Sequence, residues 1–197
     1  MSLLHVTDIL RISGARKPLP MSDEDKEWYF ARGKMIHRET ELFDTAEHGL
    51  DWGLVDESIR PFVEGYALFR KEMKGKLIAC ECRIENSMLG YCGTIDRVFA
   101  DLGGVRGTYI VDLKTNDWDT ATKWQVAAYA KLWARQNGLL KLPYIRALAL
   151  KDDGTYRLGP KPGDKWDTRI CWSEFLFAKT WAQMLLANGL AKQEERE

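Results

Sequence analysis

The sequence lacks a net charge, and this absence limits how the chain could bind nucleic acid. It has 197 residues, with 29 lysines and arginines balanced by 29 aspartates and glutamates. Proteins that hold DNA by bulk attraction carry a strong positive excess. Any contact of this chain with DNA must therefore come from local clusters of charge, or from a metal ion that offsets phosphate repulsion.

Long apolar runs are also missing. No stretch reaches the roughly 18 apolar residues of a membrane span. The start, Met1-Ser-Leu-Leu-His5, meets a charge at Asp8 without the basic region and apolar run of a signal peptide. We therefore expect a cytoplasmic protein with no membrane partner.

The third absence is a paired cysteine motif. The four cysteines are Cys80, Cys82, Cys92 and Cys171, and no Cys-x-x-Cys pair occurs among them. The first three fall in predicted strands, which is typical of small buried residues. We interpret all four as buried reduced thiols; an iron–sulfur cluster or a zinc site is the weaker alternative.

The length suits one domain, residues 1–197, with a substantial core. Hydrophobic periodicity and turn signals predict two helices first, from Ser22 to about Ala46 and from Asp56 to Met73. Three strands follow, at Leu77–Ile84, Tyr91–Ala100 and Val105–Lys114, and then a helix at Asp119–Gln136. The C-terminal part, within 142–190, is predicted to hold a strand at Tyr144–Leu150 and a helix from an N-cap at Ser173 to about Ala187. This order predicts an α/β (α+β) fold and excludes a regular doubly wound sheet.

Asp112-Leu113-Lys114, at the end of an apolar run, is the most informative segment. Period-two alternation places the Asp112 and Lys114 side chains on one face of a strand. A carboxylate can hold a hard divalent cation, and a neighbouring lysine can position water or neutralise charge that builds on a phosphate. The alternative is a solvated strand end.

Asp96 follows Gly93-Thr-Ile on the preceding strand. If these strands form a hairpin, Asp96 lies across from Asp112. Two carboxylates at that distance repel each other unless a cation lies between them. A divalent metal ion would supply the cation, whereas two solvated carboxylates are the alternative.

Two predicted helices carry further candidate site residues. His37 lies four residues after Gly33, a residue that costs about 1 kcal/mol in a helix interior and fits a close approach of backbone or ligand. Gln125 and Tyr129 share a helical face and could contact a phosphate or orient a lysine. The alternatives are an ordinary surface or core histidine, a solvated Gln125 and a core Tyr129.

Three more residues complete the set of candidate site residues. Glu81 points away from its neighbouring cysteines and is either an acid near the metal or a salt-bridge partner. Trp118 and Trp124 flank the start of the Gln125 helix and are the best candidates for stacking on bases.

Four motifs occur in order between residues 33 and 129: Gly33-x-x-x-His37, Gly93-x-x-Asp96, Asp112-x-Lys114 and Gln125-x-x-x-Tyr129. Together they resemble the RecB-like exonuclease branch of the PD-(D/E)XK nuclease superfamily, in its compact phage and bacterial form. The resemblance implies a restriction-endonuclease-like core, with a central mixed β-sheet flanked by helices.

The resemblance also implies a role for each residue. Asp96 and Asp112 would ligate Mg²⁺ or Mn²⁺ with the backbone carbonyl of Leu113, and His37 would bind or border the metal. Lys114 would position the attacking water. The remaining residues are Gln125 and Tyr129, which would line the site, and Glu81, which matches an acid found there in compact members.

The activity implied is metal-dependent exonuclease cleavage of DNA in processing, recombination or repair, in a bacterial or phage-infected cell. A restriction-type or structure-specific endonuclease is the near alternative, and a non-catalytic DNA-binding or assembly subunit is the alternative of another class. The cysteine positions do not match the relatives with iron–sulfur clusters. With no helicase or ATPase motif, unwinding would come from a helicase, recombinase or single-strand-binding partner; self-association stays open.

Overall fold

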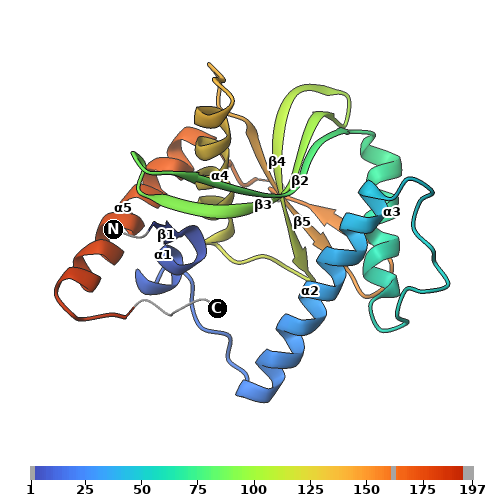
Figure 1. Ribbon diagram of the computed structural model, residues 1–197, viewed down its shortest axis with the longest axis horizontal. Helices are drawn as coiled ribbons and strands as arrows, with labels where there is room; N and C mark the ends of the chain where they lie inside the picture. Colours follow the sequence, from blue (N-terminus) through green and yellow to red (C-terminus); the bar gives the residue numbers. More distant parts are fainter. Residues whose placement is uncertain (1–2, 161–162, 193–197) are drawn as a thin grey trace.

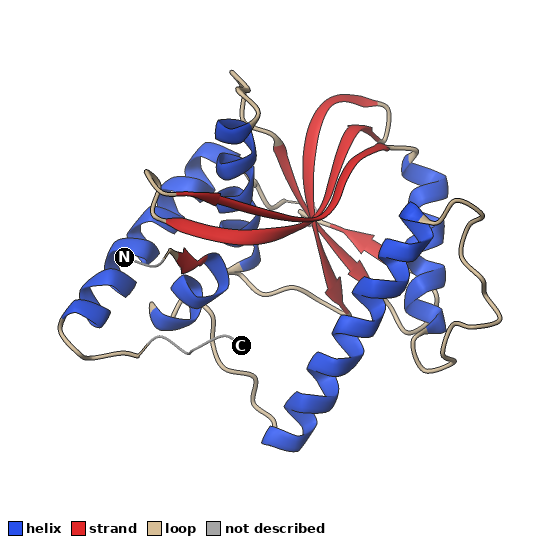
Figure 2. Ribbon diagram, viewed as in Figure 1, coloured by secondary structure: helices blue, strands red, loops and turns tan. Residues whose placement is uncertain are grey.

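The computed structural model describes residues 3–160 and 163–192, and in them a mixed β-sheet has helices on both faces (Figures 1 and 2). The elements are β1 (Leu4–His5), α1 (Val6–Ile12), α2 (Asp23–Thr45), α3 (Arg60–Met73), β2 (Lys76–Asn86), β3 (Tyr91–Leu102), β4 (Val105–Thr115), α4 (Thr122–Gln136), β5 (Tyr144–Leu150), β6 (Tyr156–Leu158) and α5 (Thr168–Ala187). The α/β class and the mixed sheet flanked by helices are confirmed.

The sheet is built around a three-strand meander. β2, β3 and β4 pair in antiparallel fashion, whereas β5 lies parallel to β4 and β6 antiparallel to β5. Parallel neighbours need a crossover, and α4 supplies it between β4 and β5. β1 adds a short parallel pairing at the start of β3.

Each face of the sheet has its own apolar core. One core lies under α1, α4 and α5, and the other lies under α2 and α3 (Figure 2). On β4 the side chains alternate between them: Val111 and Leu113 pack in the α2–α3 core, and Ile110 packs in the α4 core. Asp112 and Lys114 therefore share the face of Ile110.

Most predicted boundaries are confirmed within a few residues, three predictions are wrong and one strand was missed. Helix α3 begins at Arg60 rather than Asp56, because a turn precedes it and Pro61 fits a first helical turn. Helix α4 begins at Thr122 rather than Asp119. Ser173 is not an N-cap: α5 begins at Thr168, capped by Asp167, and the Ser173 hydroxyl donates to the Arg169 carbonyl. Strand β6 was not predicted.

Helix α2 is only half embedded. Its N-cap Ser22 accepts a hydrogen bond from the Asp25 N–H at 3.1 Å, as the sequence predicts. Its buried residues are Ile36 and Thr40, so the helix from Asp23 to Met35 extends beyond the core (Figure 1). No helix among the described residues is long and apolar enough to cross a membrane.

Candidate metal centre

The candidate site lies where β3 and β4 separate. β3 pairs with β4 from Arg97 to Leu102, and with β1 only at Tyr91 and Cys92, while β2 covers the other edge. The register, continued by one pair beyond Arg97–Val111, brings Asp96 opposite Asp112, as the hairpin predicts. There the Asp96 carboxylate accepts a hydrogen bond from the backbone N–H of Leu113 at 2.7 Å. This side-chain bond takes the place of the next backbone hydrogen bond between the two strands.

Three potential metal ligands converge at this point from three elements. The ligand atoms of His37 on α2, Glu81 on β2 and Asp96 on β3 all lie within 4.8 Å of one another. His37 Nδ1 is 3.3 Å from Glu81 Oε1 and 3.9 Å from Asp96 Oδ1. One imidazole nitrogen and two carboxylates form a donor set that suits Mn²⁺ or Mg²⁺.

Glu81 is held in an unusual backbone conformation. Its φ is 44°, in the left-handed region, which costs a non-glycine residue about 1 kcal/mol or more. Its neighbours Cys80 and Cys82 pair with Arg97 and Ile95, so Glu81 lies opposite Asp96. The strained backbone thus accompanies an acid that lies beside His37 and Asp96. Glu81 is a salt-bridge partner of Arg97, and its role as an acid near a metal stays a prediction.

Asp112 and Lys114 lie beside this group but outside it. The Asp112 side chain is buried, and Lys114 Nζ is 2.5 Å from its Oδ2. Among the described residues, none gives Asp112 Oδ2 a hydrogen bond of good geometry. The backbone of Leu113 pairs with Leu148 on β5, and a role for its carbonyl stays a prediction.

The charges of the site interact strongly. Burial alone would lower the pKa of His37, but attraction to Asp96 and the hydrogen bond to Glu81 outweigh it and raise that pKa. Burial would raise the pKa of Glu81, but His37 and Arg97 hold it below its ordinary value. Burial, followed by repulsion from Asp112 and Glu81, raises the pKa of Asp96 to about 6. A bound cation would relieve this repulsion.

Gln125 and Tyr129 of α4 are both buried next to the carboxylates, so the solvated alternative for Gln125 is wrong. Gln125 donates to the Tyr129 hydroxyl at 3.2 Å, and burial and the charge of Asp112 raise the pKa of Tyr129. Gly93 makes room for this ring, because a Cβ there would lie 2.4 Å from Tyr129 Cε1.

Two arginines that sequence reasoning missed support the site. Arg16, after α1, donates to Gln125 Oε1 at 2.9 Å and to Asp119 Oδ2 at 2.8 Å. Arg97 is fully buried, although it immediately follows Asp96 in the sequence. A basic residue next to the motif aspartate is a visible signal, but its partners come from distant helices.

The guanidinium of Arg97 joins four elements. It donates to Asp44 at 2.8 Å and to Thr40 at 3.0 Å on α2, to Tyr66 at 3.0 Å on α3, and to Glu81 at 2.8 Å on β2. Burial would lower its pKa, but the surrounding Tyr66, Cys80, Asp44 and Glu81 raise it. Arg97 therefore stays charged and holds Glu81 beside His37.

The remaining residues singled out in the sequence are Gly33, the four cysteines and two tryptophans. A Cβ at Gly33 would meet no protein atom within 4 Å, so no backbone approaches it. None of the four cysteines forms a disulfide, but only Cys171 is fully buried, so the prediction of four buried thiols is wrong for Cys80, Cys82 and Cys92, which are partly exposed on the strands. Burial raises the pKa of Cys80 to about 12 and that of Cys171 to about 11. Trp124 donates to Glu174 at 2.5 Å, and Arg157 lies 4.4 Å over Trp118, so both tryptophans already have protein partners.

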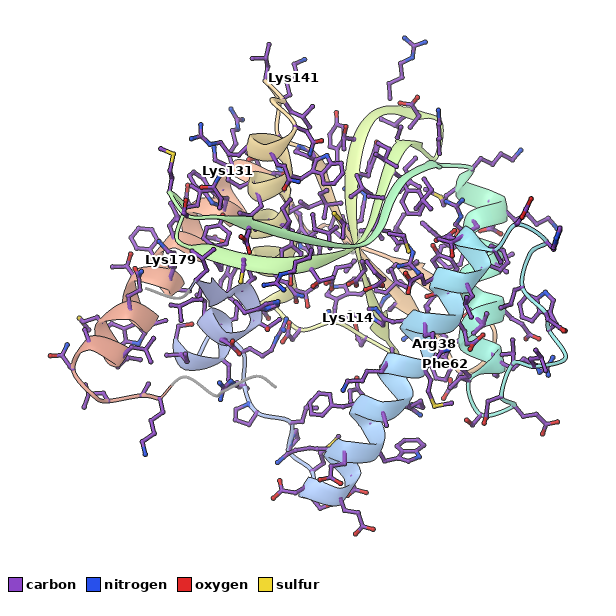
Figure 3. The ribbon with its side chains drawn as sticks, viewed as in Figure 1. Arg38, Phe62, Lys114, Lys131, Lys141 and Lys179 are labelled. Carbon is purple, nitrogen blue, oxygen red and sulfur yellow. The ribbon has the colours of Figure 1, made fainter. Side chains whose placement is uncertain are left out.

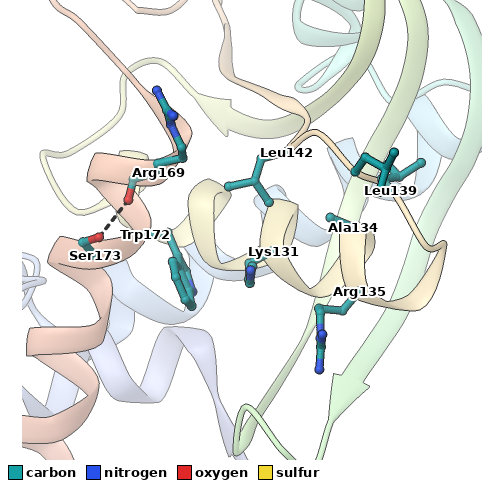
Figure 4. Close-up of a pocket in the computed structure, with 9 residues that line it drawn as sticks. Lys131, Ala134, Arg135, Leu139, Leu142, Arg169, Trp172 and Ser173 are labelled. Atoms are coloured by element: carbon teal, nitrogen blue, oxygen red, sulfur yellow. Dashed lines mark hydrogen bonds between the residues drawn. The ribbon is translucent and has the colours of Figure 1, made fainter.

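A separate cavity of about 410 Å³ lies between α4, the loop after it and the start of α5 (Figure 4). Lys131, Arg135 and Arg169 surround an apolar wall that includes Leu142 and Trp172. None of the residues of the candidate metal site lines it, so this basic cavity is a different feature of the molecule.

No protein-family model matches this chain, and no curated protein matches its sequence. The interpretation of the site therefore depends on the motifs and on their geometry.

Proposed function

We propose that this protein is a metal-dependent nuclease of the RecB-like PD-(D/E)XK type that hydrolyses phosphodiester bonds in DNA, acting as an exonuclease in processing, recombination or repair. The observation that carries the proposal is the convergence of His37, Glu81 and Asp96 beside the buried Asp112–Lys114 pair. Arg97 and Lys114 pair with Glu81 and Asp112, but the burial of Asp96 beside these two acids is still costly unless a further cation binds there.

The residues present fit a divalent cation. Asp112 Oδ2 is buried without a well-oriented donor, and the pKa of Asp96 is raised by burial and by its acidic neighbours. His37, Glu81, Asp96 and Asp112 would hold Mg²⁺ or Mn²⁺, with the Leu113 carbonyl assisting. When bound, the ion would act as a Lewis acid on a phosphoryl oxygen and lower the pKa of water.

The protein's own groups would then orient the reaction. Released from Asp112, the Lys114 ammonium would direct a water toward the phosphorus and stabilise the charge that develops on the phosphate. The hydrogen-bonded pair of Gln125 and Tyr129 would contact the strand without adding charge. Arg97 would keep Glu81 in place, and Arg16 would orient Gln125.

The arrangement of elements supports the same proposal. A helix, the β2–β3–β4 meander, helix α4 and the parallel strand β5 follow in the order expected for a restriction-endonuclease-like core. We place the protein in the cytoplasm of a bacterial or phage-infected cell, with DNA ends as substrate and a helicase, recombinase or single-strand-binding protein as partner.

Degradation of end-labelled linear DNA tests the proposal, with single- and double-stranded substrates, Mg²⁺, Mn²⁺ or EDTA, and a closed circular control. We expect metal-dependent loss of linear DNA only, abolished in Asp112→Ala and retained in Asp152→Ala, which changes an exposed acid in a turn. Cleavage of the circle would indicate an endonuclease. Binding without cleavage in either metal would indicate a non-catalytic subunit.

A further inference from the structure

The face of α2 that carries His37 continues beyond the metal site. Phe30, Gly33 and His37 are spaced by three and four residues, so they lie in one row along the helix. His37 contacts Glu81 at 3.3 Å, which fixes this row on the side of the candidate site. Gly33 and Phe30 therefore lead from the site toward the exposed end of α2.

No contact within the described part of the chain requires a glycine at position 33. Its helical position costs about 1 kcal/mol against alanine. A Cβ added there would meet nothing within 4 Å, in contrast to Gly93, where it would strike the Tyr129 ring. What glycine provides at this position is a bare helix surface one turn from His37.

Phe30 is an aromatic residue that packs in neither of the two apolar cores. Its side chain is 56% exposed, on the part of α2 from Asp23 to Met35 that contains no buried residue. Trp28 is also exposed, but the Arg32 guanidinium lies 4.3 Å over its ring, whereas the Phe30 ring meets Tyr29 in a T-shaped arrangement with centroids 6.0 Å apart. The exposed Phe30 ring is thus the one in line with His37.

This end of α2 is anchored to the strand that carries Lys114. Tyr29 and Thr115 join the helix to β4 through their hydroxyls, 3.1 Å apart, and Thr115 directly follows Lys114. Lys114 also lies near enough to His37 of α2 for its charge to act on that histidine. Phe30, seven residues before His37, lies about 10 Å from it along the axis, the length of roughly three stacked nucleotides.

We propose that Phe30 and Gly33 form a binding track for single-stranded nucleic acid, in which a base stacks on Phe30 and the sugar-phosphate backbone passes over Gly33 toward Lys114. A flat ring on an open helix surface takes an unstacked base, whereas the bases of a duplex are covered by one another. Stacking would also supply affinity that a chain of zero net charge lacks. This inference rests on the proposed nuclease function and names a single strand as its substrate.

The test measures binding of a fluorescent single-stranded oligonucleotide by anisotropy, with Mg²⁺, in the Lys114→Ala background. We expect Phe30→Ala to weaken binding about tenfold and Phe30→Tyr to restore it, because one base stack is lost and regained. Phe177→Ala, which removes a 78% exposed ring on α5, is the matched control and should bind normally. Binding of the duplex should change less than twofold in Phe30→Ala.

Gly33→Ala gives a second, independent readout. Because the site is open and alanine favours a helix, this variant should raise Tm by about 2–4 °C. It should nevertheless weaken single-strand binding, since its methyl group occupies the track. A variant that fails to fold cannot produce this combination.

The outcomes separate the inference from the function on which it rests. Wild-type cleavage that persists unchanged in Phe30→Ala and Gly33→Ala would overturn the track and leave the nuclease proposal intact. Equal losses in Phe30→Ala and Phe177→Ala would also overturn it. No cleavage by wild type, with the binding losses still observed, would overturn the nuclease proposal and support the track.

Discussion

At the scale of single residues, Lys114 and Asp112 would have different roles in the candidate site. Their side chains share one face of β4 and form an ion pair at 2.5 Å, while Asp96 binds the backbone of Leu113 from β3. The acids would hold a cation, and the lysine would act on the reacting groups. Substitutions at these positions should therefore have different signatures.

Replacement of Lys114 by alanine should lower kcat about 10²- to 10³-fold with little change in DNA binding, because the ammonium would act mainly in the transition state. Steady-state cleavage and binding in EDTA measure the two effects. Lys141→Ala is the control, since Lys141 is exposed and lies far from Lys114 (Figure 3). Wild-type cleavage rates in Lys114→Ala would refute the assignment.

Asp96→Asn should stabilise the metal-free protein at neutral pH. The pKa of Asp96 is raised to about 6, so the folded state favours its protonated form, and ionisation costs stability as pH rises from about 4 to 6. Asparagine carries no charge and can still accept the Leu113 N–H. We expect a gain of about 1–3 kcal/mol above pH 6 that disappears near pH 4.

Urea unfolding of the two proteins in EDTA across this pH range checks the prediction. Glu81, whose pKa is lowered, destabilises both proteins at low pH. We expect Mn²⁺ to stabilise the wild type and to have no such effect on Asp96→Asn. A constant difference between the proteins from pH 4 to pH 8 would show that Asp96 does not titrate in this range.

At the scale of elements, β3 and α4 fit together only because one residue is glycine. Gly93 lies under the Tyr129 ring, and Tyr129 in turn accepts a hydrogen bond from Gln125. The motif glycine on β3 and the motif tyrosine on α4 are therefore two sides of one contact. This contact positions α4 against the carboxylates.

Gly93→Ala should destabilise the fold by about 1–3 kcal/mol, because its methyl group would force the buried ring and α4 to shift. Thermal unfolding measures the loss, and cleavage should fall as well, since Gln125 moves with the helix. Gly33→Ala is the matched control for stability alone, because the same change there meets open space and should not lower Tm. Equal Tm values for Gly93→Ala and wild type would contradict this packing.

At the scale of the whole molecule, the network around Arg97 ties the helical layer to the sheet. The side chains of Arg97 and Asp44 are both fully buried, and Arg70 adds a second cation 3.0 Å from Asp44. Tyr66 also donates to Asp44. Helices α2 and α3 are thus fixed relative to β2 and β3 by charges as well as by the apolar core.

Arg97→Met should cost about 3–5 kcal/mol, because it leaves Glu81 without its arginine partner and the buried Asp44 with Arg70 alone. Arg97→Lys should recover little, since an ammonium cannot reproduce the several directed bonds of the guanidinium. Equilibrium urea unfolding checks both. Arg83→Met, which alters an arginine of β2 whose side chain is 81% exposed, should change stability by less than about 0.5 kcal/mol.

Local patterns determined much of the fold. The alternation on β2 to β4, the apolar run of β5 and the cap at Ser22 each appear in a few neighbouring residues, so these elements could be predicted. Short or ambiguous segments could not: β6 has three residues, and Ser173 looks like a cap only until Asp167 takes that place. Element ends depend on competition between neighbouring caps and turns.

The sequence by itself determined the motif residues, the hairpin that brings Asp96 toward Asp112 and the shared face of Asp112 and Lys114, because strand and helix periods fix such relations locally. Only the tertiary structure decided that His37 meets Glu81 and Asp96, that Gly93 faces Tyr129 while Gly33 faces open space, and that Arg97 and Arg16 serve the site. These contacts join residues far apart in the chain, and their geometry follows from how α2, α4 and the sheet pack.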